Sequence, residues 1–261
     1  MSFTDDQLVR YSKQIIIPEV GPAGQTKISS GRALLIGAGG LGSIVAYYLC
    51  AAGVGTIGVV DHDIVDLSNL HRQILHFTKD IGKAKVDSAA ESLTALNPDS
   101  RVIACRERLT ASNAMEIMQD YDLVVDCADN FSTKFLLNDA CIMAGKPLFF
   151  GAVLRFVGQA LTILPGEGPC YRCLFREPPP PGIAPTCAQA GVLGVLPGTI
   201  GLIQATEVLK YFLGLGDLLV GKMLTYNALT MEFSKIKIRK NPDCPVCGIN
   251  PTITELANCE Q

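Results

Sequence analysis

The chain has 261 residues, of which 48% are hydrophobic and 18% are charged, and its formal net charge is −3. This composition is typical of a well-buried globular protein with one large α/β core or two modest ones. The absence of a basic excess argues against nucleic acid as a direct partner. The most apolar stretch, residues 191–203, is too short to span a bilayer, so no membrane association is expected. Residues 1–6 lack a secretory signal, and the expected compartment is the cytoplasm.

In chain order, residues 5–30 are predicted to form an N-terminal helix and a loop broken by Pro18, Gly21 and Pro22. Strands are expected next, at residues 33–37, 56–60, 101–105 and 122–126. Helical patterns separate them, at residues 41–52, 83–96 and 112–119. Strands that alternate with helices predict a doubly wound, mostly parallel, Rossmann-like α/β sheet.

The pattern changes beyond Lys146. Residues 147–153 and 158–164 are short, apolar and bounded by turns, which predicts added strands and leaves an antiparallel pairing open. Residues 177–185 contain five prolines and are expected to form an exposed loop. A helix at about 200–213 and a pair of strands near 222–239 complete a single predicted domain.

A glycine-rich turn, with Gly37, Gly39, Gly40 and Gly42, follows the first predicted strand. Its glycines let the backbone approach a phosphate chain, and the N-terminus of the next helix offers free N–H groups. Asp61 ends the second predicted strand, roughly twenty positions later, where a carboxylate can accept hydrogen bonds from ribose hydroxyls. The motif predicts an adenosine nucleotide and leaves NAD and ATP open.

Charged residues follow the second predicted strand, among them Arg72 and Lys85. They supply the cations that triphosphate oxygens require, whereas a dehydrogenase needs an apolar slot for nicotinamide. A solvated, charged start of a helix is the alternative. Asp129 follows the strand at 122–126, where ligands of open α/β sheets bind, and is expected to hold Mg²⁺. Asp126 is expected to be a strand-end or helix-capping residue, and the same role is the alternative for Asp129.

The ten cysteines include two CxxC pairs, Cys170 with Cys173 and Cys244 with Cys247. Two such turns facing each other supply a tetrahedral four-sulfur site for structural zinc. Two redox-active dithiols or two disulfides are the alternatives. Cys187 follows the proline-rich segment, and a cysteine on a loop near a helix start can act as a nucleophile. No histidine adjoins it, so its role stays open.

Together these residues resemble the ThiF/MoeB/HesA family, relatives of the ubiquitin-activating enzymes, and its MoeB-type molybdopterin-synthase adenylyltransferases in particular. The likeness extends from about residue 7 to residue 256. It is carried by Arg10, Tyr11, the glycine-rich turn from Gly37 to Gly42, Asp61, Ser68, Asn69, Leu70, His71, Arg72, Gln73, Lys85, Asp129, Asn130 and the four paired cysteines.

The resemblance implies an ATP-dependent adenylyltransferase. Such an enzyme activates the C-terminal Gly-Gly carboxylate of a ubiquitin-like sulfur-carrier protein as an acyl-adenylate. The pathway would be that of molybdopterin, thiamine or tRNA thiolation, with molybdopterin favoured. ATP, Mg²⁺ and Zn²⁺ are the implied cofactors, and a homodimer and a persulfide sulfur donor are further implied partners. An NAD-dependent Rossmann oxidoreductase is the alternative function.

The resemblance also divides residues 1–261 into a helical arm (1–30), a nucleotide-binding half (31–146) and a carrier-binding half with the zinc site (147–261). The implied nucleotide contacts are Gly40, Asp61, Ser68, Asn69, Leu70, His71, Arg72, Lys85, Asp129 and Asn130. Arg72, Lys85 and Asp129 are the implied catalytic residues, and Cys187 aligns with a cysteine that some relatives use to form a thioester or acyl disulfide. Where many relatives have an arginine that reaches the neighbouring subunit's nucleotide, this chain has Lys13.

Overall fold

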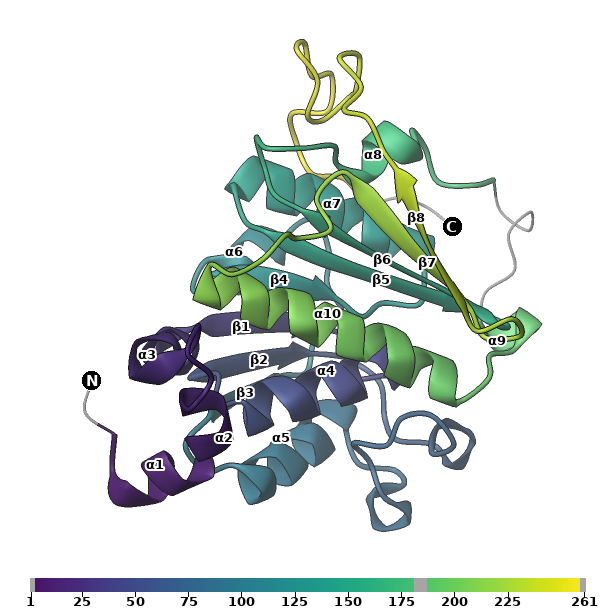
Figure 1. Ribbon diagram of the computed structural model, residues 1–261. Helices are drawn as coiled ribbons and strands as arrows, with labels where there is room; N and C mark the ends of the chain where they lie inside the picture. The colour runs from purple at the N-terminus through teal and green to yellow at the C-terminus, as the bar shows by residue number, and fades with distance from the viewer. Residues whose placement is uncertain (1–2, 181–186, 259–261) are drawn as a thin grey trace.

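The structure is a computed structural model that describes residues 3–180 and 187–258. Within these ranges the centre is an eight-stranded sheet in the order β3-β2-β1-β4-β5-β6-β7-β8 (Figure 1). The strands are β1 (Arg32–Ile36), β2 (Thr56–Val60), β3 (Arg101–Cys105), β4 (Leu123–Asp126), β5 (Leu148–Leu154), β6 (Val157–Ile163), β7 (Lys222–Asn227) and β8 (Glu232–Lys237). The first five pair in parallel, and β6, β7 and β8 add antiparallel pairs. The predicted sheet is confirmed, including its C-terminal extension.

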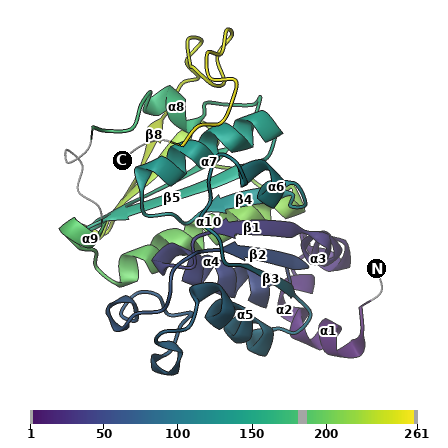
Figure 2. The same cartoon turned by 180° about the vertical axis from the view of Figure 1, so that it is seen from behind.

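Helices cover both faces of the sheet (Figures 1 and 2). They are α1 (Asp5–Arg10), α2 (Ser12–Ile15), α3 (Gly21–Ser30), α4 (Gly40–Ala51), α5 (Lys85–Leu96), α6 (Ala114–Met118), α7 (Phe131–Ala144), α8 (Tyr171–Leu174), α9 (Cys187–Ala190) and α10 (Val195–Leu213), with two 3₁₀ turns, η1 (Leu67–Asn69) and η2 (Thr78–Asp80). Helices α4, α5 and α10 pack on one face, and α6 and α7 pack on the other. None of the described helices is both long and apolar enough to cross a membrane.

Alternate residues of the central strands supply the two cores. Leu35 and Val59 lie in the cluster under α4 and α10, whereas Leu34, Ile36 and Val60 lie in the cluster under α6 and α7. Successive side chains of a strand point to opposite faces, and both faces of a parallel sheet are buried. This explains why these strands are continuous apolar runs in the sequence.

Two expectations about helices were wrong or incomplete. Within residues 5–30, expected as one helix and a loop broken by Pro18, Gly21 and Pro22, the structure has a further helix, α3. Pro22 does not break it, because it lies in the first turn, where a missing N–H costs no hydrogen bond. Helix α7 was not predicted, although its signals are present. The Asn130 side chain caps its first turn, and Gly145 ends it with a φ of 65°, a left-handed conformation.

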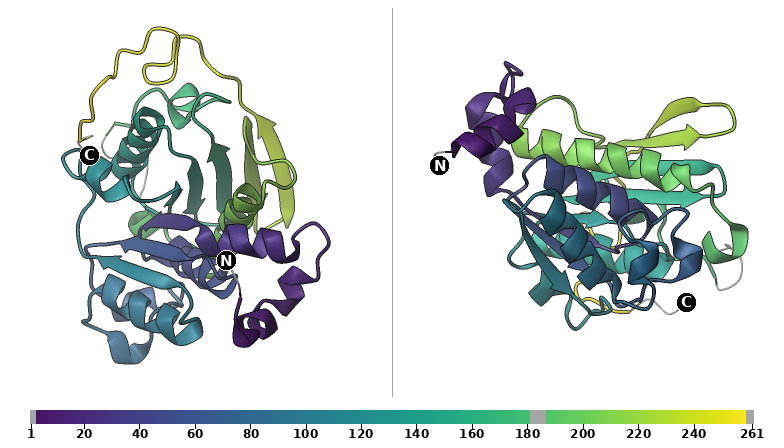
Figure 3. Two further views of the ribbon diagram at one scale, coloured as in Figure 1. Left: turned by 90° about the vertical axis from the view of Figure 1, so that its left-hand side faces the viewer. Right: turned by 90° about the horizontal axis from the view of Figure 1, so that it is seen from below.

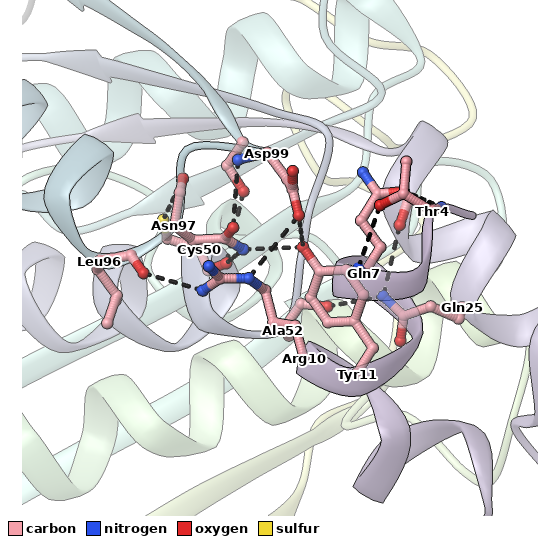
Figure 4. A network of polar contacts seen from close by, with 12 residues as sticks. Thr4, Gln7, Arg10, Tyr11, Gln25, Cys50, Ala52, Leu96, Asn97 and Asp99 are labelled. Carbon is pink, nitrogen blue, oxygen red and sulfur yellow. Dashed lines mark hydrogen bonds and ion pairs between the residues drawn. The ribbon is translucent and has the colours of Figure 1, made fainter.

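The N-terminal arm is fastened to the ends of α4 and α5 (Figure 4). Arg10 donates from Nη1 to the carbonyl of Leu96 (3.1 Å), and the Tyr11 hydroxyl donates to Asp99 Oδ2 (3.1 Å). The Asn97 side chain in turn donates to the Tyr11 hydroxyl (2.9 Å). Residues 96–99 precede β3, so the arm holds the edge of the sheet opposite the carboxyl ends of the strands. The Arg10–Tyr11 motif therefore anchors this arm within its own chain.

Candidate active site

The glycine-rich turn fits tightly against the loop that follows β4. Gly37 has a φ of 106°, and a Cβ atom there would lie 2.8 Å from the carbonyl oxygen of Cys127. A Cβ at Gly42 would lie 2.0 Å from the carbonyl oxygen of Gly37, so the first turn of α4 packs directly on the strand end. These two positions require glycine. The turn thereby presents the N-terminus of α4, a helix that begins at Gly40, to the space above the sheet.

The Asp61 carboxylate lies beside this turn. Its Oδ2 accepts a hydrogen bond from the backbone N–H of Ala38 (2.8 Å), and its Oδ1 accepts one from the N–H of Asp63 (2.9 Å). These bonds fix the carboxylate at the carboxyl end of β2. This is the place from which a carboxylate holds the ribose of a nucleotide in doubly wound folds.

Lys85 is the first residue of α5, and its side chain is buried except for about 7% of its area. Its Nζ donates to Asp63 Oδ2 at 2.9 Å. Partial burial by itself raises the pKa of Asp63, but the hydrogen bond and the charge of Lys85 outweigh it and hold that pKa below its usual value. Lys85 therefore supplies a fixed positive charge at the cleft.

Arg72 is aimed by the short segment that precedes it. Its Nη1 donates to the carbonyl of Ser68 (3.0 Å) and lies 3.3 Å from a ring nitrogen of His71. The backbone N–H of Ser68 in turn donates to Asp66 Oδ1 (2.8 Å), which caps η1. Arg72 lines the cleft, whereas Ser68, Asn69, Leu70 and His71 do not. Ser68 and His71 thus hold the side chain of Arg72 in place. Nucleotide contacts by Ser68, Asn69, Leu70 and His71 remain predictions.

Asp129 and Asn130 follow β4. Asp129 lines the cleft and has no hydrogen bond or ion pair with any described part of the chain, so its carboxylate oxygens are available to a cation. Carboxylate oxygen is the ligand that Mg²⁺ prefers, and the residue therefore fits the expected metal. The Asn130 Oδ1 accepts from the N–H of Thr133 (2.9 Å) and from the hydroxyl of Ser132 (2.9 Å). Asn130 is thus the N-cap of α7 and also lines the cleft.

Two buried side chains beneath the cleft hold its loops in place: Lys134, which was not predicted from the sequence, and His76, for which a hydrogen-bonding role was expected. Lys134 is buried, donates to Asp126 Oδ2 (3.0 Å) and to the carbonyl of Gly151 (2.6 Å), and lies 4.5 Å from the centre of the Phe150 ring. His76 is also buried and bonds the carbonyl of Ala38 and the hydroxyl of Ser88, each at 2.9 Å. Lys134 lies eight positions after Asp126, a spacing that carries no recognisable signal without the fold.

The glycine-rich turn, Asp61, Arg72, Lys85 and the residues that follow β4 surround one cleft of about 1290 Å³ at the carboxyl ends of β1, β2 and β4. The cleft continues along the turn between β5 and β6, where Arg155 lines it, and Pro197 of α10 closes its floor beside Gly40. Pockets for one small ligand usually occupy about 300–1000 Å³. The cleft therefore has room for a nucleotide and for part of a second substrate. Of the predicted site residues, it collects Gly40, Asp61, Arg72, Lys85, Asp129 and Asn130.

The four paired cysteines converge away from this cleft. Their Sγ atoms all lie within 4.8 Å of one another, with Cys170 3.5 Å from Cys244 and Cys173 3.4 Å from Cys247. Tetrahedral zinc, with Zn–S bonds of about 2.3 Å, separates its sulfur ligands by about 3.8 Å. The geometry fits a closed, structural zinc site and disfavours the alternative of two independent dithiols.

Cys187 begins α9, and its side chain lies outside the described part of the structure, as do residues 181–186 of the expected proline-rich loop. The chain that follows α9 is held against the turn between β5 and β6. The N–H of Arg155 donates to the carbonyl of Gly191 (2.9 Å), and the N–H of Leu193 donates to the carbonyl of Arg155 (3.0 Å). The role expected for Cys187 remains a prediction.

Residues 11–246 match the model of the ThiF family. The chain belongs to the ThiF family. It is 52% identical to the sulfur carrier protein adenylyltransferase of Thermus thermophilus over 100% of this chain and 98% of that protein. It is also 51% identical to the SAMP-activating enzyme E1 of Haloferax volcanii over 95% of this chain and 92% of that protein. This ThiF protein is an adenylyltransferase, and the alternative of an NAD-dependent oxidoreductase is set aside.

A longer relative agrees with this assignment, and a solved structure shares the fold. The adenylyltransferase and sulfurtransferase MOCS3 of Sus scrofa is 46% identical over 99% of this chain, which spans 57% of that protein. The crystal structure of E. coli MccB with MccA-N7isoASN superposes with a TM-score of 0.82 at 21% identity, covering 92% of this chain and 74% of that one. At this identity the likeness shows the fold alone.

Proposed function

We propose that this ThiF protein uses ATP to adenylate the C-terminal Gly-Gly carboxylate of a ubiquitin-like sulfur-carrier protein. The observation that carries the proposal is the single cleft that joins the glycine-rich turn to Arg72, Lys85 and Asp129. The names of its relatives from Thermus thermophilus and Haloferax volcanii support a carrier of this kind. Among the pathways, that of molybdopterin is the first to test, and the cytoplasm is the proposed compartment.

The proposed reaction is a displacement at the α-phosphorus of ATP. An oxygen of the carrier carboxylate forms a bond to this phosphorus, the bond to the β-phosphate oxygen breaks, and pyrophosphate leaves. The nucleophile is already ionised, so the protein contributes position and charge stabilisation. Asp61 holds the ribose, the N-terminus of α4 and Arg72 contact the phosphates, and Lys85 stabilises the charge that develops on the leaving group. Mg²⁺ held by Asp129 would neutralise phosphate oxygens.

We further propose a homodimer in which Lys13, exposed on α2, takes the place of the arginine found in many relatives. Lysine keeps the positive charge but lacks the two-pronged geometry of a guanidinium group. A persulfide sulfur donor is a further proposed partner. Cys187 is the candidate for a covalent thioester or acyl disulfide with the carrier. Zinc at the four cysteines is proposed to be structural, because no position of the site is left for a substrate.

Carrier-dependent exchange of pyrophosphate into ATP tests this function. We expect Arg72→Ala and Asp129→Ala to lower the exchange rate by about a hundredfold or more, since each removes a charge that faces the phosphates. Arg101→Ala is the matched control, because Arg101 is exposed at the start of β3, on the opposite edge of the sheet. Exchange without a carrier, or full exchange in Asp129→Ala, would contradict the proposal.

A further inference from the structure

The chain beyond the second CxxC pair forms a segment that we call the C-terminal strap, residues 249–258. It begins folded onto the cysteine turn, where the N–H of Ile249 donates to the carbonyl of Pro242 (2.8 Å). The N–H groups of Thr252 and Ile253 both donate to the carbonyl of Pro245, at 2.9 and 2.8 Å. In the left panel of Figure 3 the yellow segment loops outward after β8 and returns along the opposite side of the molecule. The strap thus runs from the cysteine cluster to the far side of the sheet.

The end of the strap reaches the nucleotide cleft. Leu256 is half-buried and packs against the core on the α6 and α7 side of the sheet. Two residues later, Asn258 Oδ1 accepts a hydrogen bond from the backbone N–H of Ala111 at 2.9 Å. The Asn258 side chain also lines the cleft. A residue from the C-terminal end is therefore part of the cleft formed by the N-terminal half.

The strap contacts a loop whose shape depends on two asparagines. This loop, residues 106–113, follows β3, and its residues 107–110 line the cleft. The N–H of Thr110 donates to Asn113 Oδ1 (2.7 Å), and the Asn113 amide donates to the carbonyl of Arg108 (3.0 Å). Asn113, a residue of the loop itself, therefore holds its shape through Thr110 and Arg108. Asn258, a residue of the strap, holds the N–H of Ala111, which follows Thr110.

Resting on the proposed function, we propose that Asn258 is a positioning residue for the base of ATP. In the proposed function, the phosphates lie at the turn after β1 and the ribose lies at Asp61 after β2. The base then extends toward β3, the next strand in the sheet, where residues 107–110 form the wall. By holding the N–H of Ala111, Asn258 keeps this wall closed against the base without itself taking part in the chemistry.

The test compares Asn258→Ala and Asn258→Asp with the unaltered full-length protein. The Kd for MgATP is measured by calorimetry without carrier, and hydrogen exchange is measured at the Ala111 amide. We expect Asn258→Ala to raise the Kd about three- to tenfold and to speed exchange at Ala111, because one hydrogen bond that orders the wall is lost. Asn258→Asp keeps the accepting oxygen, so its Kd for MgATP and its exchange rate at Ala111 are expected to match those of the unaltered protein. Thr254→Ala, at another exposed position of the strap, is the control.

The outcomes distinguish a failure of the role proposed for Asn258 from a failure of the proposed function. An unchanged Kd in Asn258→Ala, while the unaltered protein binds MgATP, would overturn the role of Asn258 and leave the proposed function standing. Failure of the unaltered protein to bind MgATP would overturn the proposed function instead, and the role of Asn258 with it. A raised Kd with unchanged exchange at Ala111 would also contradict the inference, because the effect would not pass through this bond.

Discussion

His76 bridges the glycine-rich turn and α5, and its contact with Ala38 places a proton on one of its two ring nitrogens. The carbonyl of Ala38 can only accept, so the ring nitrogen Nε2 that faces it at 2.9 Å carries the proton. Nδ1 lies 2.9 Å from the hydroxyl of Ser88, a group that can donate or accept. A neutral ring with its proton on Nε2 is compatible with both neighbours. Burial lowers the pKa of His76, which agrees with this assignment.

A pH dependence of stability follows. The unfolded chain takes up a proton at His76 near pH 6.5, whereas the folded protein does so only at a lower pH. The stability that the neutral ring provides is fully present above about pH 6.5. It is lost as the pH falls from that value through the lowered folded pKa, by at most about 1.4 kcal/mol per pH unit. Urea unfolding at pH 7.5 and 5.5 should show a smaller loss for His76→Gln than for the unaltered protein. Equal losses would contradict the prediction.

At the scale of elements, one buried side chain of α7 joins this helix to two neighbouring strands of the sheet. Lys134, near its start, bonds the end of β4 through Asp126 and the middle of β5 through Gly151. The Asp126 side chain is fully buried, and its other oxygen accepts from the N–H of Ala128 (3.0 Å). The pair therefore holds the loop that carries Asp129 in a fixed place relative to the strands.

Lys134→Met is expected to destabilise the protein by about 3–5 kcal/mol, because it leaves a buried carboxylate without its counter-charge. The double variant Lys134→Met with Asp126→Asn removes that charge and is expected to regain part of the loss. Urea denaturation of the two variants measures the difference. If the double variant were no more stable than Lys134→Met, the buried charge would not be the cause.

Asn130 allows the capping role and the expected nucleotide contact to be separated. Asn130→Ala removes the oxygen that caps α7 and should cost about 1 kcal/mol of stability. Asn130→Asp keeps the oxygen but loses the amide donor, so stability should be retained while the Kd for MgATP rises if the amide contacts the nucleotide. An Asn130→Asp variant with an unchanged Kd would leave Asn130 as a cap alone.

How far the sequence predicts these elements depends on how local their signals are. Periodicity was enough for the alternating strands and for α4 and α5, and the CxxC spacing was enough for the cysteine cluster. Pro22 does not reveal α3, because a proline indicates a break in a helix unless its position in that helix is known. The Lys134–Asp126 pair, the His76 bridge and the contact of Asn258 join positions that only the folded chain brings together. No residue-type pattern marks them.

At the scale of the molecule, the four-cysteine cluster joins α8 to the segment after β8, two parts far apart in the sequence. A metal there closes a long loop, which is where a cross-link restricts the unfolded chain most in principle. Burial raises the pKa of the Cys170 thiol. A bound divalent cation would offset this cost, because thiolates are its ligands.

We expect one zinc ion per chain by metal analysis. Cys244→Ser should lose this ion and lower the thermal midpoint by about 10 °C or more, since a structural zinc contributes several kcal/mol. Cys105→Ser is the matched control, because Cys105 is only partly buried and lies outside the cluster. Full zinc content in Cys244→Ser would show that the metal, if bound, is held elsewhere.

The backbone hydrogen bonds between Arg155 and the residues after α9 limit how far Cys187 can lie from the turn between β5 and β6. Gly191 follows this cysteine by four positions, and its carbonyl is fixed to the turn between β5 and β6. Four residues reach at most about 14 Å when fully extended. The proposed covalent adduct of Cys187 would therefore form near the turn between β5 and β6, which lines the same cleft, so an activated tail would have only a short distance to travel.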